Sequence, residues 1–143
     1  MQRPHQVVVL VLDGALPLDV GIPAEVFQPE TGFGYEVSAC GATAGTVPSH
    51  GGFGYAVPRG LDALADADTI IVPGYAPAGR PIPVQVRDAL RGAASRGARI
   101  ASICYGAFAL AEAGLLDGLR ATTHWDAAQK LAARYPDVTV EPN

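Results

Sequence analysis

Cys104 stands where two different sequence patterns meet. Residues 98–103 form an apolar run with no helical period, whereas residues 106–113 are rich in Ala and Leu and are followed by Gly114. The first pattern predicts a buried strand and the second a helix, with no loop between them. A thiol at such a corner faces the amino terminus of a helix, where unpaired N–H groups favour an anion. The pattern predicts a nucleophile elbow whose cysteine has a lowered pKa.

Cys104 has a second interpretation, because most free cysteines are small buried hydrophobes. The elbow pattern is short, so the corner alone does not separate a reactive thiol from a packing residue. Gly106 allows two backbones to approach closely at the corner, which suits an elbow. The decision between the two interpretations therefore depends on the rest of the chain.

The composition restricts the class of protein. A chain of 143 residues is long enough for one domain with one core. Its net charge of −4 argues against contact with nucleic acid through this segment. Cys40 and Cys104 lie far apart, so no disulfide framework is expected and a reducing cytoplasm fits. The apolar run over 7–12 is too short for a signal peptide or a membrane span.

Apolar runs alternate with helical patterns along the chain. The predicted strands cover 7–12, 35–40, 69–72, 98–103, 120–123 and 138–141, and the predicted helices begin at Pro23 or cover 83–96, 106–113 and 125–133. This alternation predicts a three-layer α/β sandwich with a mostly parallel sheet. Ligands of such sheets bind beyond the carboxyl ends of the strands. Asp19, Gly74–Tyr75 and Cys104–Tyr105 follow strands, so we expect them to converge on one mouth.

Three segments resemble the ThiJ/PfpI superfamily, which has the class I glutamine amidotransferase-like, flavodoxin-like fold. They are residues 18–27, 72–74 and 102–125. The resemblance is strongest to the amino-terminal domain of GlxA-type regulators of the AraC family. Isocyanide hydratases share much of the pattern, including the Leu18–Asp19 pair and the Thr-Thr-His-Trp sequence at 122–125.

The resemblance implies a domain that senses a small molecule in a pocket around Cys104. The ligand-binding residues that it implies are Glu25, Gly74, Tyr75, Tyr105, Gly106 and His124. The alternative is a hydratase-like enzyme in which Cys104 is the nucleophile and Asp19 is the acid. In that case the backbone N–H groups of Tyr75 and Tyr105 stabilise developing negative charge.

The chain departs from the family pattern at several positions. Tyr105 replaces the usual Thr and Tyr75 the usual second Gly, and both tyrosines are expected to narrow the pocket and supply hydroxyl groups. The relatives continue past the point that corresponds to Asn143 with a further strand and helix. We therefore expect residues 1–143 to form a carboxyl-terminally incomplete domain, without a DNA-binding domain, whose exposed apolar surface is covered by a partner, as in a homodimer.

Other chemistries fit the sequence less well. A cysteine peptidase or glutaminase needs a histidine base, but Tyr105 follows the cysteine and no His-x-Glu occurs near the carboxyl end. His124 precedes a predicted helix and is interpreted as a cap or a packing residue rather than as a base. No His, Cys, Asp or Glu cluster has the spacing of metal ligands, so neither a metal nor another cofactor is predicted.

Overall fold

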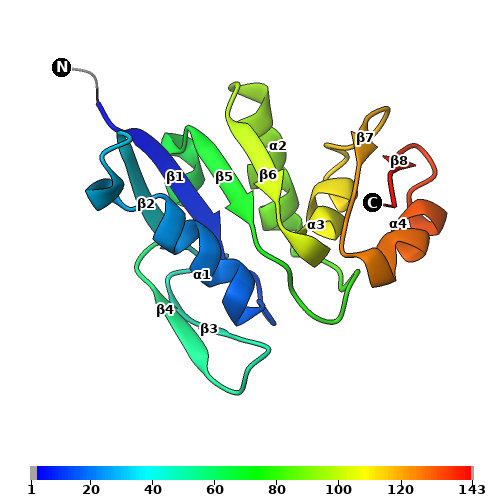
Figure 1. The fold of residues 1–143 in the computed structure, drawn as a ribbon, viewed down its shortest axis with the longest axis horizontal. Coiled ribbons are helices and arrows are strands. Elements are labelled where there is room, and N and C mark those ends of the chain that lie inside the picture. Colours follow the sequence, from blue (N-terminus) through cyan, green and yellow to red (C-terminus); the bar gives the residue numbers. More distant parts are fainter. Residues whose placement is uncertain (1–2, 143) are drawn as a thin grey trace.

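The centre of the molecule is a parallel sheet of four strands in the order β2-β1-β5-β6. The computed structural model describes residues 3–142, so Met1, Gln2 and Asn143 lie outside the described part. In chain order the strands are β1 (His5–Leu10), β2 (Tyr35–Cys40), β5 (Thr69–Val72) and β6 (Arg99–Ser102). Figure 1 shows them side by side, with the helices distributed over both faces. The predicted α/β fold with a parallel sheet is confirmed.

The inner strands are buried on both faces and the outer ones are not. Residues Val7–Leu10 of β1 are all buried, as are Ile70, Ile71 and Val72 of β5. Exposure alternates along β2 and β6, which lie at the two edges. A strand with neighbours on both sides in a three-layer fold needs apolar residues throughout. The uniformly apolar runs therefore predicted the central strands.

Helices cover the two faces of the sheet unequally. On one face, α1 (Pro17–Val26) lies in front of β1 and β2 (Figure 1). On the other face lie α2 (Val84–Ser95) and α3 (Ala107–Glu112), where Leu90 and Phe108 are fully buried. These two layers and the sheet make the predicted three-layer arrangement.

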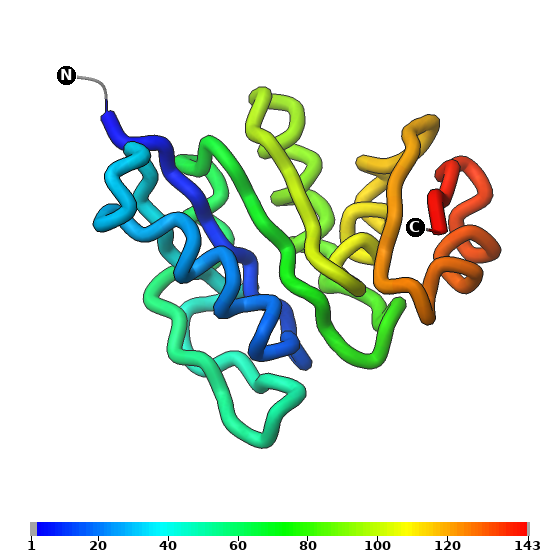
Figure 2. The backbone as a smooth tube through the Cα atoms, in the orientation of Figure 1, coloured from blue at the N-terminus to red at the C-terminus, as the bar shows by residue number. Residues whose placement is uncertain are grey.

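Two smaller sheets flank the main one. β3 (Gly45–Pro48) and β4 (Gly54–Val57) form an antiparallel hairpin, and β7 (Arg120–Ala121) pairs in parallel with β8 (Thr139–Val140), beside α4 (Ala128–Arg134). The 3-10 turns are Pro29–Thr31, Leu61–Asp66, Cys104–Gly106 and Trp125–Ala127. Figure 2 shows the last part of the chain set apart from the main sheet. The two predicted carboxyl-terminal strands exist, but they are shorter than expected and pair with each other.

Helix α1 begins six residues earlier than predicted. Pro17 occupies its start and Pro23 lies inside it, although both prolines could have opened a helix. Two backbone hydrogen bonds hold the residues just before the helix in an extended conformation. The Leu16 N–H donates to the carbonyl oxygen of Gly74, and the Ala76 N–H donates to that of Gly14. Residues 14–16 therefore lie beside the 74–76 segment, and the helix begins directly after them. The prediction of a helix starting at Pro23 is wrong.

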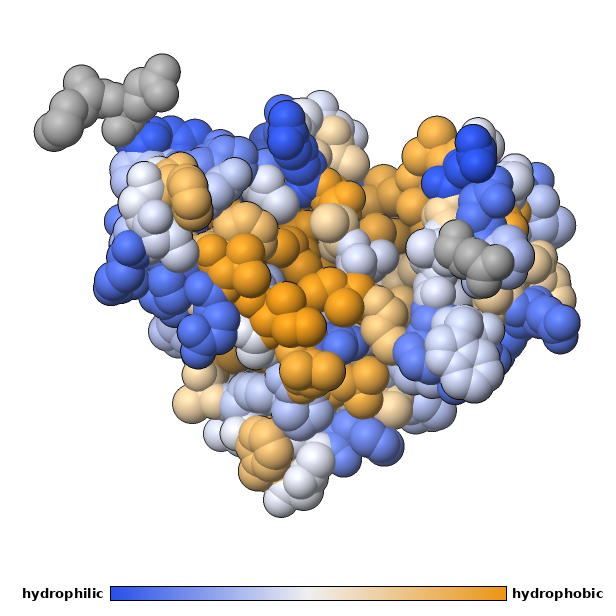
Figure 3. Space-filling model, in the orientation of Figure 1, coloured by the Kyte–Doolittle hydropathy of each residue, from blue (hydrophilic) through white to orange (hydrophobic). Residues whose placement is uncertain are grey.

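An apolar stripe runs along the outer surface of α1. Leu18, Ile22 and Val26 are spaced four residues apart and are exposed. Figure 3 shows apolar side chains gathered on this face of the molecule. Among residues 3–142, no helix is both long and apolar enough to cross a bilayer.

Candidate functional site around Cys104

Cys104 occupies a backbone conformation that L-residues rarely adopt. Its φ is 56°, and no other non-glycine residue among residues 3–142 has a positive φ. The chain leaves β6 through Ile103 and enters the 3-10 turn at once. A Cβ at Gly106 would collide with the carbonyl oxygen of Val72, so only glycine fits this approach. The predicted elbow and the role of Gly106 in it are confirmed.

A threonine that the sequence analysis missed anchors the elbow. Thr123 Oγ1 donates to the carbonyl oxygen of Cys104 at 2.8 Å, and the Ile103 N–H donates to the carbonyl oxygen of Val72 at 3.0 Å. These bonds tie the corner to the segment after β7 and to β5. Thr123 lies in the Thr-Thr-His-Trp sequence, which was a signal that it belonged to the site.

Asp19, Gly74 and Tyr105 meet next to the elbow. The Gly74 N–H donates to Asp19 Oδ2 at 3.1 Å, and Asp19 is the buried charged residue of the described chain. A Cβ at Gly74 would lie 2.5 Å from Asp19 Oδ2 and 3.2 Å from the Tyr105 nitrogen. The absence of a side chain at Gly74 therefore keeps the space between the carboxylate and this amide open. The predicted convergence is confirmed for Asp19, Gly74 and the Tyr105 backbone.

The thiol of Cys104 does not have the lowered pKa that the elbow pattern predicted. Burial raises the pKa of this thiol, and the negative charges of Asp19 and Asp126 raise it further, while the backbone N–H of Tyr105 lowers it. Burial and the two carboxylates outweigh the single amide at the helix terminus. The pKa of the Cys104 thiol therefore lies above its ordinary value.

Asp126 joins Tyr105 and His124 at the rim of the site. The Tyr105 hydroxyl donates to Asp126 Oδ2 at 2.8 Å, and His124 Nδ1 lies 2.8 Å from Asp126 Oδ1. The bond to Asp126 raises the pKa of Tyr105 to about 12, and the bond from Tyr105 lowers that of Asp126. His124 caps the turn over Trp125–Ala127, as predicted. Sequence reasoning missed Asp126, because an acidic residue at a helix start is usually explained by the helix dipole.

Tyr75 and Glu25 are the other two side chains predicted to contact a ligand. The side chain of Tyr75 belongs to the core cluster with Ile82 and Phe108, and within residues 3–142 its hydroxyl has no hydrogen-bond partner. Burial and the charge of Glu112 raise the pKa of Tyr75 far above its ordinary value. The prediction that Tyr75 supplies a hydroxyl to the mouth at Cys104 is wrong, because only its backbone lies there. Glu25 is exposed in the last turn of α1, and its ligand contact stays a prediction.

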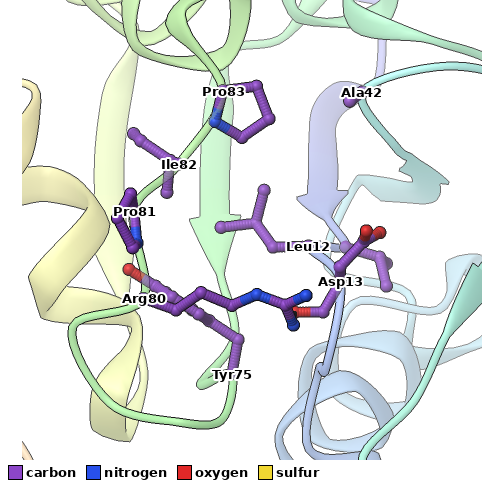
Figure 4. Close-up of a pocket in the computed structure, with 9 residues that line it drawn as sticks. Leu12, Asp13, Ala42, Tyr75, Arg80, Pro81, Ile82 and Pro83 are labelled. Carbon is purple, nitrogen blue, oxygen red and sulfur yellow. Dashed lines mark hydrogen bonds between the residues drawn. The ribbon is translucent and has the colours of Figure 1, made fainter.

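A cavity of about 230 Å³ lies near the site but is not lined by Cys104. Its walls include Leu12, Tyr75 and Ile82, and Arg80 extends across it towards Asp13 (Figure 4). Within the described part of the chain, no group of three or more His, Cys, Asp or Glu residues could hold a metal ion.

Comparison with known proteins identifies the family. Residues 5–141 match the model of the DJ-1/PfpI family. The chain belongs to this family. It is 44% identical over 136 residues to an uncharacterized protein in the cpoL 5′ region of Streptomyces lividans. This match covers 93% of the present chain and 96% of that protein.

Other DJ-1/PfpI relatives carry functional names. The chain is 34% identical to the HTH-type transcriptional regulator CdhR of Pseudomonas aeruginosa over 107 residues. This match covers 74% of the present chain and 32% of CdhR. Over 59 residues, 41% of this chain, the identity to the isonitrile hydratase of Pseudomonas putida is 44%, and the match spans 26% of that enzyme. A solved AraC-family transcriptional regulator from Pseudomonas putida has the same fold, with a TM-score of 0.82, 20% identity, and coverage of 98% of this chain and 77% of that chain.

Proposed function

We propose that this chain is a small-molecule-binding domain of the kind found in AraC-type transcriptional regulators, with its ligand site around Cys104. The observation that carries the proposal is the space at the elbow, which Gly74 leaves open between the buried Asp19 carboxylate and the Tyr105 backbone N–H. Burial and two carboxylates also raise the pKa of the Cys104 thiol. A thiol is a poor nucleophile compared with a thiolate. Cys104 in this state acts as a ligand contact, and the relationship to the regulator CdhR supports the same conclusion.

The proposed site offers few but well-placed polar groups. Asp19 supplies a buried carboxylate and Tyr105 supplies its backbone N–H, and Gly74 leaves room between them. Since Asp126 already accepts a bond from the Tyr105 hydroxyl, the phenol ring is held at the rim. The arrangement suits a small ligand with one donor and one acceptor.

A regulator also needs contact with DNA. The net charge of −4 disfavours such contact through this domain. We assign DNA binding to another domain of a longer product, and we place the protein in the cytoplasm as a homodimer. The exposed stripe of Leu18, Ile22 and Val26 supplies apolar area that a second subunit could cover.

Hydratase-like catalysis is the second candidate, and the position of Asp19 beside the thiol favours it. The Cys104 thiol would pass its proton to Asp19 as its sulfur bonds to the isonitrile carbon, and Asp19 would return this proton to the same carbon to form a thioimidate. Water would then add to the same carbon, and the thiol would leave with a proton to give the N-substituted formamide. The identity to isonitrile hydratase supports this route, whereas the raised pKa of Cys104 opposes it.

One experiment separates the two candidates. The protein is incubated with cyclohexyl isonitrile at pH 7, and N-cyclohexylformamide is quantified against Cys104→Ala. The binding proposal expects no more product than the variant forms. Product that depends on Cys104 would overturn the proposal in favour of the hydratase.

A second measurement tests binding itself. Thermal shifts are recorded over a collection of small metabolites for the wild type, Cys104→Ala, Asp19→Asn and Asp88→Asn. Binding at the proposed site predicts stabilising compounds whose effect is lost in the first two variants. Asp88→Asn is the matched control, because it makes the same substitution at an exposed position of α2 outside the proposed site. Stabilisation that persists in both site variants would refute a pocket around Cys104.

A further inference from the structure

The cavity that Cys104 does not line is placed where open α/β sheets bind ligands. It lies beyond the carboxyl ends of β1 and β2, beneath the 76–83 loop, and its volume is about 230 Å³. Strand β2 pairs with one edge of β1, and β5 pairs with the other edge, so the direction of strand addition reverses at β1. The crevice at such a reversal of strand order is the usual ligand site of this architecture. The cavity therefore needs an explanation of its own.

Side chains from two helices hold the loop that covers the cavity. Glu112 Oε2, from α3, accepts the N–H of Ile82 at 2.9 Å. From α4, Lys130 Nζ donates to the carbonyl oxygen of Ala78 at 2.6 Å and Arg134 donates to the next carbonyl oxygen at 2.8 Å. The covering wall is thus fixed by three charged side chains, so the cavity exists before any ligand binds.

One charged side chain at the cavity, Arg80, has unused hydrogen-bonding capacity. Arg80 crosses the mouth towards Asp13 (Figure 4), and its contact there is a bond of 3.3 Å from Nη1 to the Asp13 carbonyl oxygen. No carboxylate within residues 3–142 forms an ion pair with Arg80. Tyr75 also lines the cavity, but its hydroxyl is sealed in the core and offers no contact to a ligand there. Arg80 is exposed and is not neutralised by a carboxylate, so its guanidinium is the group with unused capacity for a ligand oxygen.

We propose that this cavity binds a short aliphatic monocarboxylate, separately from the site at Cys104. Arg80 offers a guanidinium fork to the carboxylate, and Leu12 and Ile82 supply an apolar surface for the chain. A volume of about 230 Å³ accommodates roughly eight non-hydrogen atoms. Arg80 is the cationic group of the lining, so a second carboxylate on the ligand would enter the cavity without a partner.

Isothermal titration of the intact chain with hexanoate at pH 7 tests the proposal. Hexanoate is expected to bind at one saturable site, while adipate and hexylamine bind more weakly or not at all. Arg80→Gln is expected to weaken hexanoate binding at least about tenfold. Ala42→Trp, at an exposed lining position, is expected to abolish the binding by filling the mouth.

Two controls make the result decisive. Arg87→Gln removes another arginine, which pairs with Asp88 on the surface, and is expected to leave hexanoate binding unchanged. Cys104→Ser is also expected to leave it unchanged, so this test does not depend on the function proposed for Cys104. The proposal is overturned if hexanoate fails to bind, if Ala42→Trp binds it like the wild type, if Arg80→Gln and Arg87→Gln behave alike, or if Cys104→Ser loses the binding.

Discussion

The close approach at Gly106 gives a sharp prediction, because the same substitution should have the opposite effect at Gly92. An alanine Cβ at Gly106 would come closer than 3.0 Å to the carbonyl oxygen of Val72, and its next neighbours are also backbone atoms. Backbone atoms within the sheet cannot rotate away as a flexible side chain can. Gly106→Ala is therefore expected to lower the free energy of unfolding by at least about 1–3 kcal/mol.

Gly92 provides the matched control. It lies in the interior of α2, where a Cβ would meet nothing closer than 3.8 Å. Alanine loses less conformational entropy than glycine in a helix, so Gly92→Ala should raise the free energy of unfolding by about 0.5–1 kcal/mol. For a chain of this size, each 1 kcal/mol corresponds to a shift in Tm of roughly 2–4 °C.

The assay is urea denaturation followed by circular dichroism at 222 nm, because Trp125, the single tryptophan, is 76% exposed and would report poorly on the core. Movement of the elbow in Gly106→Ala should also change the rate at which Cys104 reacts with iodoacetamide. If Gly106→Ala is as stable as the wild type, the claim that the elbow depends on this backbone approach is refuted. If Gly92→Ala is destabilising, the helix argument fails instead.

Three further predictions concern charge and packing. The pKa of the Cys104 thiol is raised, so its rate of alkylation should rise with pH through a midpoint above the ordinary value of 9.0. The variant Asp19→Asn should lower that midpoint, because it removes a negative charge near the thiol. The Arg3 guanidinium lowers the pKa of Asp68 from 3.8 to about 2. The stability that this ion pair contributes above pH 4 should therefore be lost as the pH falls towards 2. Between pH 2 and 5, the Tm of Asp68→Asn should depend less on pH than the Tm of the wild type. Leu90→Ala empties a fully buried position, and urea denaturation should show a loss of about 2–5 kcal/mol.

Local patterns were sufficient for much of the fold. The apolar runs predicted the strands of the main sheet, because a strand covered on both faces must be apolar throughout. The change from an aperiodic run to an Ala-rich helix placed the elbow at Cys104, and Gly106 indicated the close backbone approach there. The start of α1 was missed because Pro17 and Pro23 both suit a helix start.

The chemistry of the site depended on contacts between distant segments. The pattern around Cys104 predicted an acidic thiol, but its pKa depends on burial and on carboxylates 85 positions earlier and 22 positions later in the chain, at Asp19 and Asp126. Likewise, the bridge between Ala15 and Tyr75 places the Tyr75 backbone at the mouth, while its side chain packs in the core. Spacing along the sequence does not show which side of a loop a side chain occupies.

The sequence by itself determined the strands, the helix after Pro83, the elbow and the resemblance to a family, since each depends on neighbouring residues and their periodicity. The tertiary structure alone decided the direction in which the pKa of Cys104 is shifted, the partners of Tyr105 and His124, and the cavity beside Arg80. These properties arise from charges and surfaces that only folding brings within a few ångströms, where electrostatic and packing energies become large enough to matter.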